Sequence, residues 1–166
     1  MVRLLAIALA VLVLAGCGGG GHGGDFSFAD GNGWHTDSTG AHPKLPQAPT
    51  ARAATVPLVE PAGAAPNATL THLPADGIVI NAFIYPRNGG LPPVPPHPLP
   101  LDLRQGRLML SWPKQPNPRL SEVRILSTTK GRPLQVDVYF GTKRLTKPLI
   151  ARAQRELRTL RLTDRG

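Results

Sequence analysis

The sequence is poor in cysteine and in aromatic residues, and it has no apolar run of membrane-spanning length. Cys17 is the only cysteine among 166 residues, and Phe, Trp and Tyr together make up 5%. A single cysteine excludes an intramolecular disulfide, so a folded domain must rely on its hydrophobic core. The apolar run of residues 4–14 is shorter than the about 20 residues that a mature transmembrane helix needs.

The motifs of common catalytic and cofactor-binding sites are also missing. After Cys17 there is no Gly-x-Ser-x-Gly, no His-Glu-x-x-His and no phosphate-binding glycine loop with a lysine. Asp76 and Asp102 lie near expected strand ends, but two unrelated exposed carboxylates are the better interpretation of this pair. We therefore expect no enzyme, no cofactor and no metal. The early histidines and aspartates are too irregularly spaced for a metal site: His22, Asp25, Asp30, His35, Asp37 and His42.

Proline and glycine, in contrast, are abundant, with 19 and 18 residues that crowd into the first hundred positions. Residues 17–72 show no sustained period of 2 or 3.6 and hold few apolar residues to offset the entropy of ordering. This composition predicts a flexible tether over 17–72, followed by a domain over 73–166. Three aromatic residues in the tether either pack on the domain or contact a partner or membrane interface: Phe26, Phe28 and Trp34.

The single cysteine stands directly behind the apolar run, in the segment Leu14-Ala15-Gly16-Cys17. A basic residue precedes the run, as in a secretory signal. This arrangement resembles the signal peptide and lipobox of bacterial lipoprotein precursors. The resemblance implies that residues 1–16 are removed and that the Cys17 thiol carries a diacylglyceryl group, with further acylation at the new N-terminus. It also implies a protein anchored in the cell membrane or outer membrane and facing away from the cytoplasm.

Three segments of the predicted domain have the patterns of β-strands. Residues 77–85 are β-branched and aromatic with apolar residues on both alternations, which predicts a central strand covered on both faces. Residues 107–112 predict a short strand. Alternation over residues 121–141 predicts a hairpin with one core face and one largely solvated face, across which Arg124 and Asp137 pair.

A helix is predicted after the hairpin, with Pro148 in its first turn and Thr146 as its cap. Its apolar stripe consists of Leu149, Ala153, Leu157 and Leu160. On its other side, Glu156 is placed to pair with Arg152, and the last arginines complement the helix dipole. The fold class is therefore α+β, a small antiparallel sheet of about four strands with one C-terminal helix packed on a face. The end of this domain is similar to the strand-then-helix ends of uncharacterised secreted proteins of high-GC bacteria.

Positive charge is concentrated in the predicted domain. The net charge is +9, and residues 75–166 hold sixteen Lys and Arg against six Asp and Glu. Beside a lipid anchor, a basic surface strengthens attachment to anionic membranes. The candidate residues for such a surface are Lys143, Arg144, Lys147, Arg152, Arg155, Arg158 and Arg161.

These observations favour a non-catalytic envelope lipoprotein whose domain binds another envelope protein. The alternative is a surface clamp, in which the basic helix binds anionic lipid or an acidic wall polymer. A hydrolase ranks below both. Nucleic acid is not an expected partner, because the basic residues are not interleaved with exposed aromatic stacking platforms.

Overall fold

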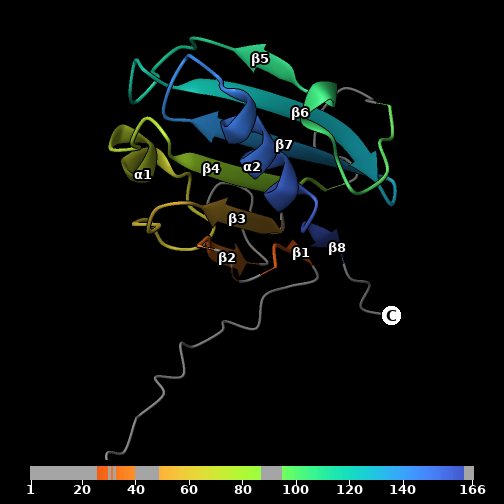
Figure 1. Ribbon diagram of the computed structural model, residues 1–166. Coiled ribbons are helices and arrows are strands. Elements are labelled where there is room, and N and C mark those ends of the chain that lie inside the picture. The colour runs from red at the N-terminus through yellow and green to blue at the C-terminus, as the bar shows by residue number, and fades with distance from the viewer. Residues whose placement is uncertain (1–25, 30, 32, 40–48, 87–94, 163–166) are drawn as a thin grey trace, which may run out of the picture.

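The computed structural model describes residues 26–29, 31, 33–39, 49–86 and 95–162 (Figure 1). The predicted signal peptide and lipobox, with Leu14, Ala15, Gly16 and Cys17, lie outside the described residues. None of the helices found in the described ranges has the length and apolarity to cross a membrane.

The described residues form a six-stranded sheet, a two-stranded sheet and three helical segments. In chain order the elements are β1 (Phe26–Ser27), β2 (His35–Thr39), β3 (Thr50–Ala54), α1 (Asn67–Thr71), β4 (Ile78–Ile84), the 3-10 helix η1 (Leu103–Gln105), β5 (Arg107–Met109), β6 (Ser121–Thr129), β7 (Arg132–Phe140), α2 (Lys147–Leu157) and β8 (Arg161–Leu162).

The segments with the clearest strand patterns make the centre of the larger sheet. Its strand order is β2-β3-β4-β7-β6-β5, with every neighbouring pair antiparallel. The prediction of β4 as a central strand is confirmed, and its apolar residues on both alternations fill the two faces. β6 and β7 form the predicted hairpin. Lys130 and Gly131 both have positive φ in its two-residue turn, as a tight turn between twisted strands requires.

The prediction of a flexible tether over residues 17–72 is wrong where the structure describes this segment. β2 and β3 extend the sheet, while β1 pairs with β8 near the end of the chain. β3 is buried along its whole length although alanine is its only apolar residue type. Its pairing with β4 and the burial of Arg52 depend on residues distant in sequence, so no local period reveals this strand. The fold class is α+β as predicted, but with more strands than the about four expected.

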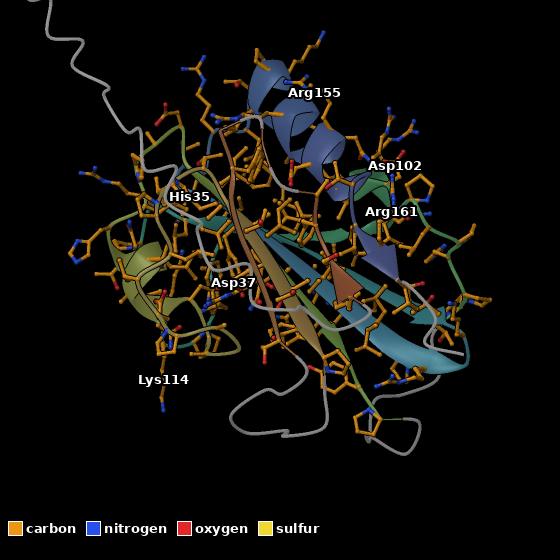
Figure 2. All side chains as sticks on the ribbon, turned by 90° about the horizontal axis from the view of Figure 1, so that it is seen from below. His35, Asp37, Asp102, Lys114, Arg155 and Arg161 are labelled. Atoms are coloured by element: carbon orange, nitrogen blue, oxygen red, sulfur yellow. The ribbon has the colours of Figure 1, made fainter. Side chains whose placement is uncertain are left out.

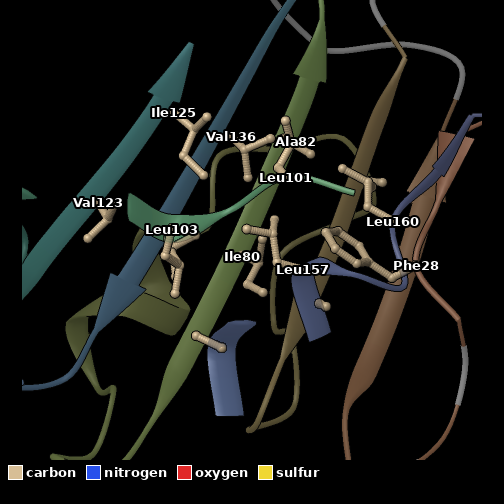
Figure 3. Close-up of a cluster of buried hydrophobic side chains, with 14 of the residues drawn as sticks. Phe28, Ile80, Ala82, Leu101, Leu103, Val123, Ile125, Val136, Leu157 and Leu160 are labelled. Atoms are coloured by element: carbon tan, nitrogen blue, oxygen red, sulfur yellow. The ribbon is translucent and has the colours of Figure 1, made fainter. Parts of the chain in front are cut away.

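One face of the large sheet is covered by α2 and by the β1–β8 pair (Figure 1). Figure 3 shows the main core between these layers, where Leu157 lies near Ile80 and Leu160 lies near Phe28. The predicted apolar stripe is confirmed on α2 for Leu149, Ala153 and Leu157, whereas Leu160 is buried in the core beyond the end of the helix. Phe28, from the segment predicted as a tether, is buried in the same cluster. This packing brings the N-terminal part of the domain against its C-terminal helix.

The other face of the sheet is covered by α1 and the segment that leads to it. Leu70 of α1 packs there with Val79 of β4 and Tyr139 of β7. The expectation that this side of the hairpin is largely solvated is therefore wrong for part of its length. Glu122 and Asp137 on the same side are 1% and 3% exposed, so charged groups lie in a buried layer. The predicted strand over 107–112 is also shorter than expected, since β5 ends at Met109.

Candidate functional site

The predicted basic helix forms, and its cations lie away from the core. Leu149, Ala153 and Leu157 are buried against the sheet, which turns Lys147, Arg155 and Arg158 outward as exposed side chains. Figure 2 shows Arg155 projecting from α2. Thr146 occupies the cap position with extended backbone, but its side chain makes no capping hydrogen bond. No acidic residue stands in the first turn, so nothing on the helix itself neutralises Lys147 there.

The cations next to α2 have different positions. Lys143 and Arg144 are exposed in the loop before the helix. Arg161 of β8 folds back, and its Nη1 donates to the carbonyl oxygen of Arg158 at 2.7 Å. This contact confirms the predicted complement to the negative end of the helix dipole. All seven predicted basic residues lack an ion pair with any other described residue, whereas the ion pairs that are present involve Arg52, Arg104 and Arg124.

Arg152 is the exception to the outward arrangement, because its guanidinium lies over the indole of Trp34. The distance from Arg152 Cζ to the ring centroid is 5.6 Å, within the range of a cation–π contact. Trp34 is itself partly buried against the main core. It is held at the start of β2 by a turn in which Trp34 N donates to Gly31 O and Gly33 has a φ of 73°. Of the roles considered for Trp34, packing on the domain is thus the one observed.

Glu156 does not pair with Arg152, contrary to the prediction from their spacing. It is 4% exposed and points into the structure, where its Oε1 accepts a hydrogen bond from the Thr159 hydroxyl at 3.3 Å. The same hydroxyl accepts from the backbone N–H of Ala29, which ties the β1 segment to the helix end. Burial raises the pKa of Glu156, and the Thr159 hydrogen bond opposes that change.

These side chains surround a hollow on one flank of α2, with a volume of about 380 Å³. Its lining residues are Trp34, Arg152, Arg155, Glu156 and Thr159. Two guanidinium groups, one carboxyl and one hydroxyl therefore converge on a space within the size range of small-ligand sites. A positive balance remains even when Glu156 is ionised.

The opposite flank of α2 packs on the segment before β5, with a second hollow of about 310 Å³ between them. The Gln154 side chain accepts from Leu103 N at 2.8 Å and donates to Leu101 O at 2.9 Å, which docks this segment on the helix. Asp102 caps η1 and pairs with Arg104, whose hydrogen bond lowers the pKa of Asp102 to about 2. A carboxylate that stays ionised near neutral pH is a poor general acid. Asp102 thus has a structural role here.

A row of polar residues crosses all six strands on the face opposite α2. Only the Arg124–Asp137 pair of this row was predicted from the sequence. Each residue stands opposite the next across neighbouring strands, in the order Asp37, Arg52, Asn81, Asp137, Arg124 and Arg107. The predicted pair is confirmed, since Arg124 Nε donates to Asp137 Oδ1 at 2.7 Å. Aligned polar residues on six strands could have been sought in the sequence only with the strand register known.

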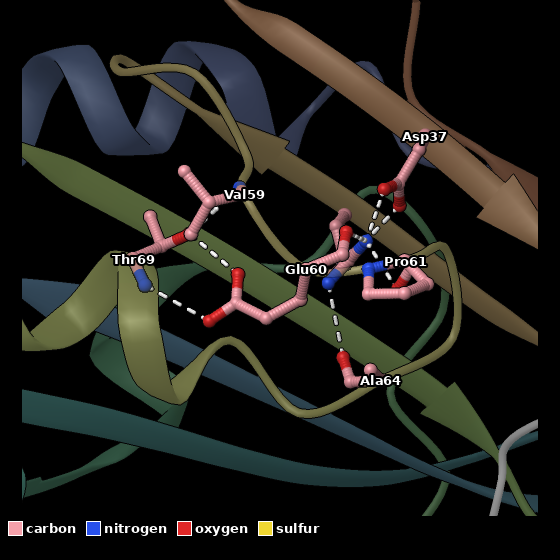
Figure 4. A network of polar contacts seen from close by, with 7 residues as sticks. Asp37, Val59, Glu60, Pro61, Ala64 and Thr69 are labelled. Carbon is pink, nitrogen blue, oxygen red and sulfur yellow. Dashed lines mark hydrogen bonds and ion pairs between the residues drawn. The ribbon is translucent and has the colours of Figure 1, made fainter.

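Arg52 is the most buried member of this row, with no exposed surface. Its guanidinium bridges Asp37 of β2 and the segment after β3, and Figure 4 shows Asp37, Pro61 and Ala64 with the dashed lines of this network. It donates to both carboxylate oxygens of Asp37 and to the carbonyl oxygens of Glu60, Pro61 and Ala64. The Glu60 carboxylate in turn accepts from the backbone N–H and hydroxyl of Thr69 in α1. These hydrogen bonds fold the segment between β3 and α1 over the sheet.

Glu122 and Asp137 form an acidic pair around Arg124. Glu122 Oε1 lies 2.7 Å from Arg124 Nη2, and Gln135 Nε2 donates to Asp137 Oδ2 at 2.7 Å. Burial and the nearby Asp137 charge raise the pKa of Glu122 to about 7, and burial also raises the pKa of Asp137. An acid that titrates near neutrality suits general acid catalysis. Both carboxyls are nearly inaccessible, however, so a substrate does not reach them in this conformation.

Of the candidate metal ligands, the structure describes His35 and Asp37, and these two do not form a metal site. Asp37 is engaged by Arg52, and His35 lies on the same edge strand with an exposed side chain. Across the ranges that the structure describes, no group of three His, Cys, Asp or Glu side chains is arranged to hold a metal ion. His22, Asp25, Asp30 and His42 lie outside those ranges.

Comparison with known proteins gives no relative from which a function could be taken. No family model matches this sequence, and the searches of curated proteins and of solved structures return no match. The hypotheses below therefore rest on this chain's own residues.

Proposed function

We propose that this chain is a cell-envelope lipoprotein, anchored through Cys17, whose non-catalytic domain binds an anionic component of the envelope through the cationic side of α2. The observation that carries the proposal is the exposure of Lys147, Arg155 and Arg158 on one side of α2 without an ion pair to any described residue. Unpaired cations are available to an external anion, whereas paired ones must first lose their partners.

The placement of the acidic residues supports this assignment. On and beside α2, Glu156 is buried and Asp102 is engaged by Arg104. The exposed side of the helix is therefore not a mixed-charge surface of the usual solubilising kind. Each basic residue near an anionic surface contributes about 1 kcal/mol, and the lipid anchor adds a second, independent attachment.

A protein partner is the second candidate, and it is favoured by the β5 edge of the sheet, which pairs with no further strand among the described residues. β5 ends the strand order, and Leu108 and Leu110 at this edge are 50% and 48% exposed. An exposed apolar edge strand offers backbone hydrogen bonds and side-chain contacts to an added strand. Leu108→Lys blocks such pairing without touching α2, so loss of a crosslinked partner in this variant alone would support this second candidate.

The main proposal is tested by sedimentation of the purified protein with neutral vesicles, anionic vesicles and purified acidic wall polymer, each at low and high salt. We expect the Cys17 lipid anchor to give binding to all vesicles that salt does not change, and a further, salt-sensitive binding to an anionic material only. Lys147→Gln with Arg158→Gln should weaken it by roughly thirtyfold, from about 1 kcal/mol for each charge. Arg107→Gln with Arg119→Gln removes the same charge from exposed positions outside α2 and is the matched control. Equal binding by the two double variants would refute the proposal.

A further inference from the structure

We infer that the hollow between Trp34 and α2 is an oxyanion-binding site, which takes a carboxylate or phosphate group carried by an acidic envelope polymer. This inference rests on the proposed function and names the part of the surface that recognises the polymer's charged groups. It assigns to Arg152 a role different from that of the outward cations.

The geometry of Arg152 carries the first step. A guanidinium is planar, and its N–H groups point outward along its edge. Arg152 Cζ lies 5.6 Å from the centroid of the Trp34 ring, and the N–H groups along the guanidinium edge remain available for two parallel hydrogen bonds to an oxyanion. The aromatic ring also restricts the long side chain, so less rotational freedom is lost when an anion binds. Trp34 is in this sense a positioning residue for Arg152.

The second step is the convergence of charge on one hollow that is open to solvent. Arg155 follows Arg152 by three residues, so the two side chains leave the helix on neighbouring positions and line the same hollow. The Thr159 hydroxyl is already engaged by Ala29 and Glu156, which leaves the two guanidinium groups as the main donors. Among the described lining residues, Glu156 is the only acidic group. Its burial raises its pKa and so disfavours the negatively charged carboxylate.

The shape of the site favours a polymer over a flat membrane. Lys147 and Arg158 point outward, away from the hollow, and meet a planar surface first. Arg152 lies aside against Trp34 and is only partly exposed, so its guanidinium is reached from within the hollow. A substituent that projects from a flexible polymer enters a hollow of about 380 Å³, whereas the headgroups of a bilayer remain in their plane.

The test is an NMR titration of the purified protein with sodium glucuronate and with inorganic phosphate, at constant ionic strength kept with chloride. We expect the Arg152 Nε–H signal and the Trp34 indole N–H signal to shift together and to saturate. Arg152→Gln should weaken binding by roughly tenfold or more, because it removes the stacked charged donor. Arg152→Lys should not restore it, since a lysine lacks the planar edge. Arg119→Gln, an exposed arginine before β6, is the charge-matched control and should bind as the parent does.

Two further variants separate this site from a diffuse charge effect. Trp34→Leu keeps every charge, yet it should weaken anion binding because Arg152 loses its platform; Trp34→Phe, which keeps an aromatic face, should retain most of it. Glu156→Gln should strengthen binding at neutral pH by removing a negative charge from the lining. Equal anion affinity in Arg152→Gln, Arg119→Gln and the parent would overturn the inference.

The outcome also distinguishes this inference from the proposed function. In one outcome, the double variant Lys147→Gln with Arg158→Gln abolishes binding to the polymer, and Arg152→Gln changes neither polymer binding nor small-anion binding. The outward face of α2 then acts alone, and the hollow is not the binding site. In the other outcome, Arg152→Gln abolishes small-anion binding, and the double variant still binds the polymer as its control does. The hollow is then an anion-binding site, and the outward face of α2 does not bind the polymer. Shifts with anionic vesicles but not with glucuronate or wall polymer would overturn the assignment to a polymer.

Discussion

Arg52 provides the sharpest test of how this fold is held together, and Arg52→Met is the perturbation. The side chain is fully buried and donates to two carboxylate oxygens of Asp37 and three backbone carbonyl oxygens. Methionine has a similar length but no donor, so all five acceptors lose the hydrogen bond from Arg52, and Pro61 O keeps only the one from Ala64 N. Breaking a buried ion pair by removing one member costs about 3–5 kcal/mol, since the remaining charge is left uncompensated. We expect the lower end, about 3 kcal/mol, because the Asp37 side chain is 24% exposed and water replaces part of the lost contact.

The assay is equilibrium unfolding of the purified protein in urea, followed by far-UV circular dichroism. About 3 kcal/mol is a large part of the 5–15 kcal/mol that a domain usually has, so the midpoint should fall substantially. Arg119→Met, at an exposed position, should stay within about 0.5 kcal/mol of the parent. Asp37→Asn combined with Arg52→Met should cost less than the sum of the two single changes, because the two side chains form one interaction. A cost below about 1 kcal/mol for Arg52→Met would refute the reasoning that this guanidinium secures the segment between β3 and α1.

Three other changes have definite expected results. Glu122→Gln should become increasingly stabilising relative to the parent as the pH rises from about 4.5 to about 7. Because the pKa of Glu122 is raised in the folded parent, the unfolded chain has already released the proton that the folded chain still holds in this window. The stability of the parent therefore falls as the pH rises, by at most about 1.4 kcal/mol per pH unit, whereas glutamine does not titrate. Urea midpoints of both proteins at several pH values check this, and parallel profiles would contradict it. Gly141→Ala should destabilise the fold by at least about 3 kcal/mol or prevent folding, because a Cβ at this position would lie 1.7 Å from the carbonyl oxygen of Pro74. Thermal unfolding and soluble yield measure this effect, and an unchanged melting temperature would show that the segments around Gly141 and Pro74 are not in contact. Leu157→Ala should lower the free energy of unfolding in urea by about 2–5 kcal/mol, because the side chain lies in the main core with no exposed surface. A loss as small as that of a substitution at an exposed position would mean that α2 does not pack on the sheet.

The elements that sequence reasoning recovered are those whose signal is local. The alternation in the hairpin predicts both of its strands and the Arg124–Asp137 pair, because residues opposite one another are set by one short turn. The helix was recovered from the spacing of Leu149, Ala153 and Leu157 for the same reason, since each turn of a helix is near in sequence to the next.

The elements that sequence reasoning missed are stabilised by distant residues. β2 contains no apolar residue, and alanine is the only apolar residue type in β3, so neither segment has the hydrophobic alternation of a strand. They form because β3 pairs with β4 and because Arg52 and Asp37 neutralise one another in the buried layer. The candidate site shows the same limit. Spacing within α2 suggests a pair between Glu156 and Arg152, but the contact with Trp34, far away in sequence, takes the arginine instead.

The sequence by itself determined the central strand, the hairpin and the C-terminal helix, the concentration of positive charge, and the resemblance of its start to a lipoprotein signal. Those properties depend on composition and on residues within a few positions of one another. Only the tertiary structure decided that Trp34 meets Arg152, that Glu156 is buried, and that a polar row crosses the sheet. Each of these depends on how layers pack over one another, and the free energy of burying a charged group is set by partners that the chain supplies from elsewhere.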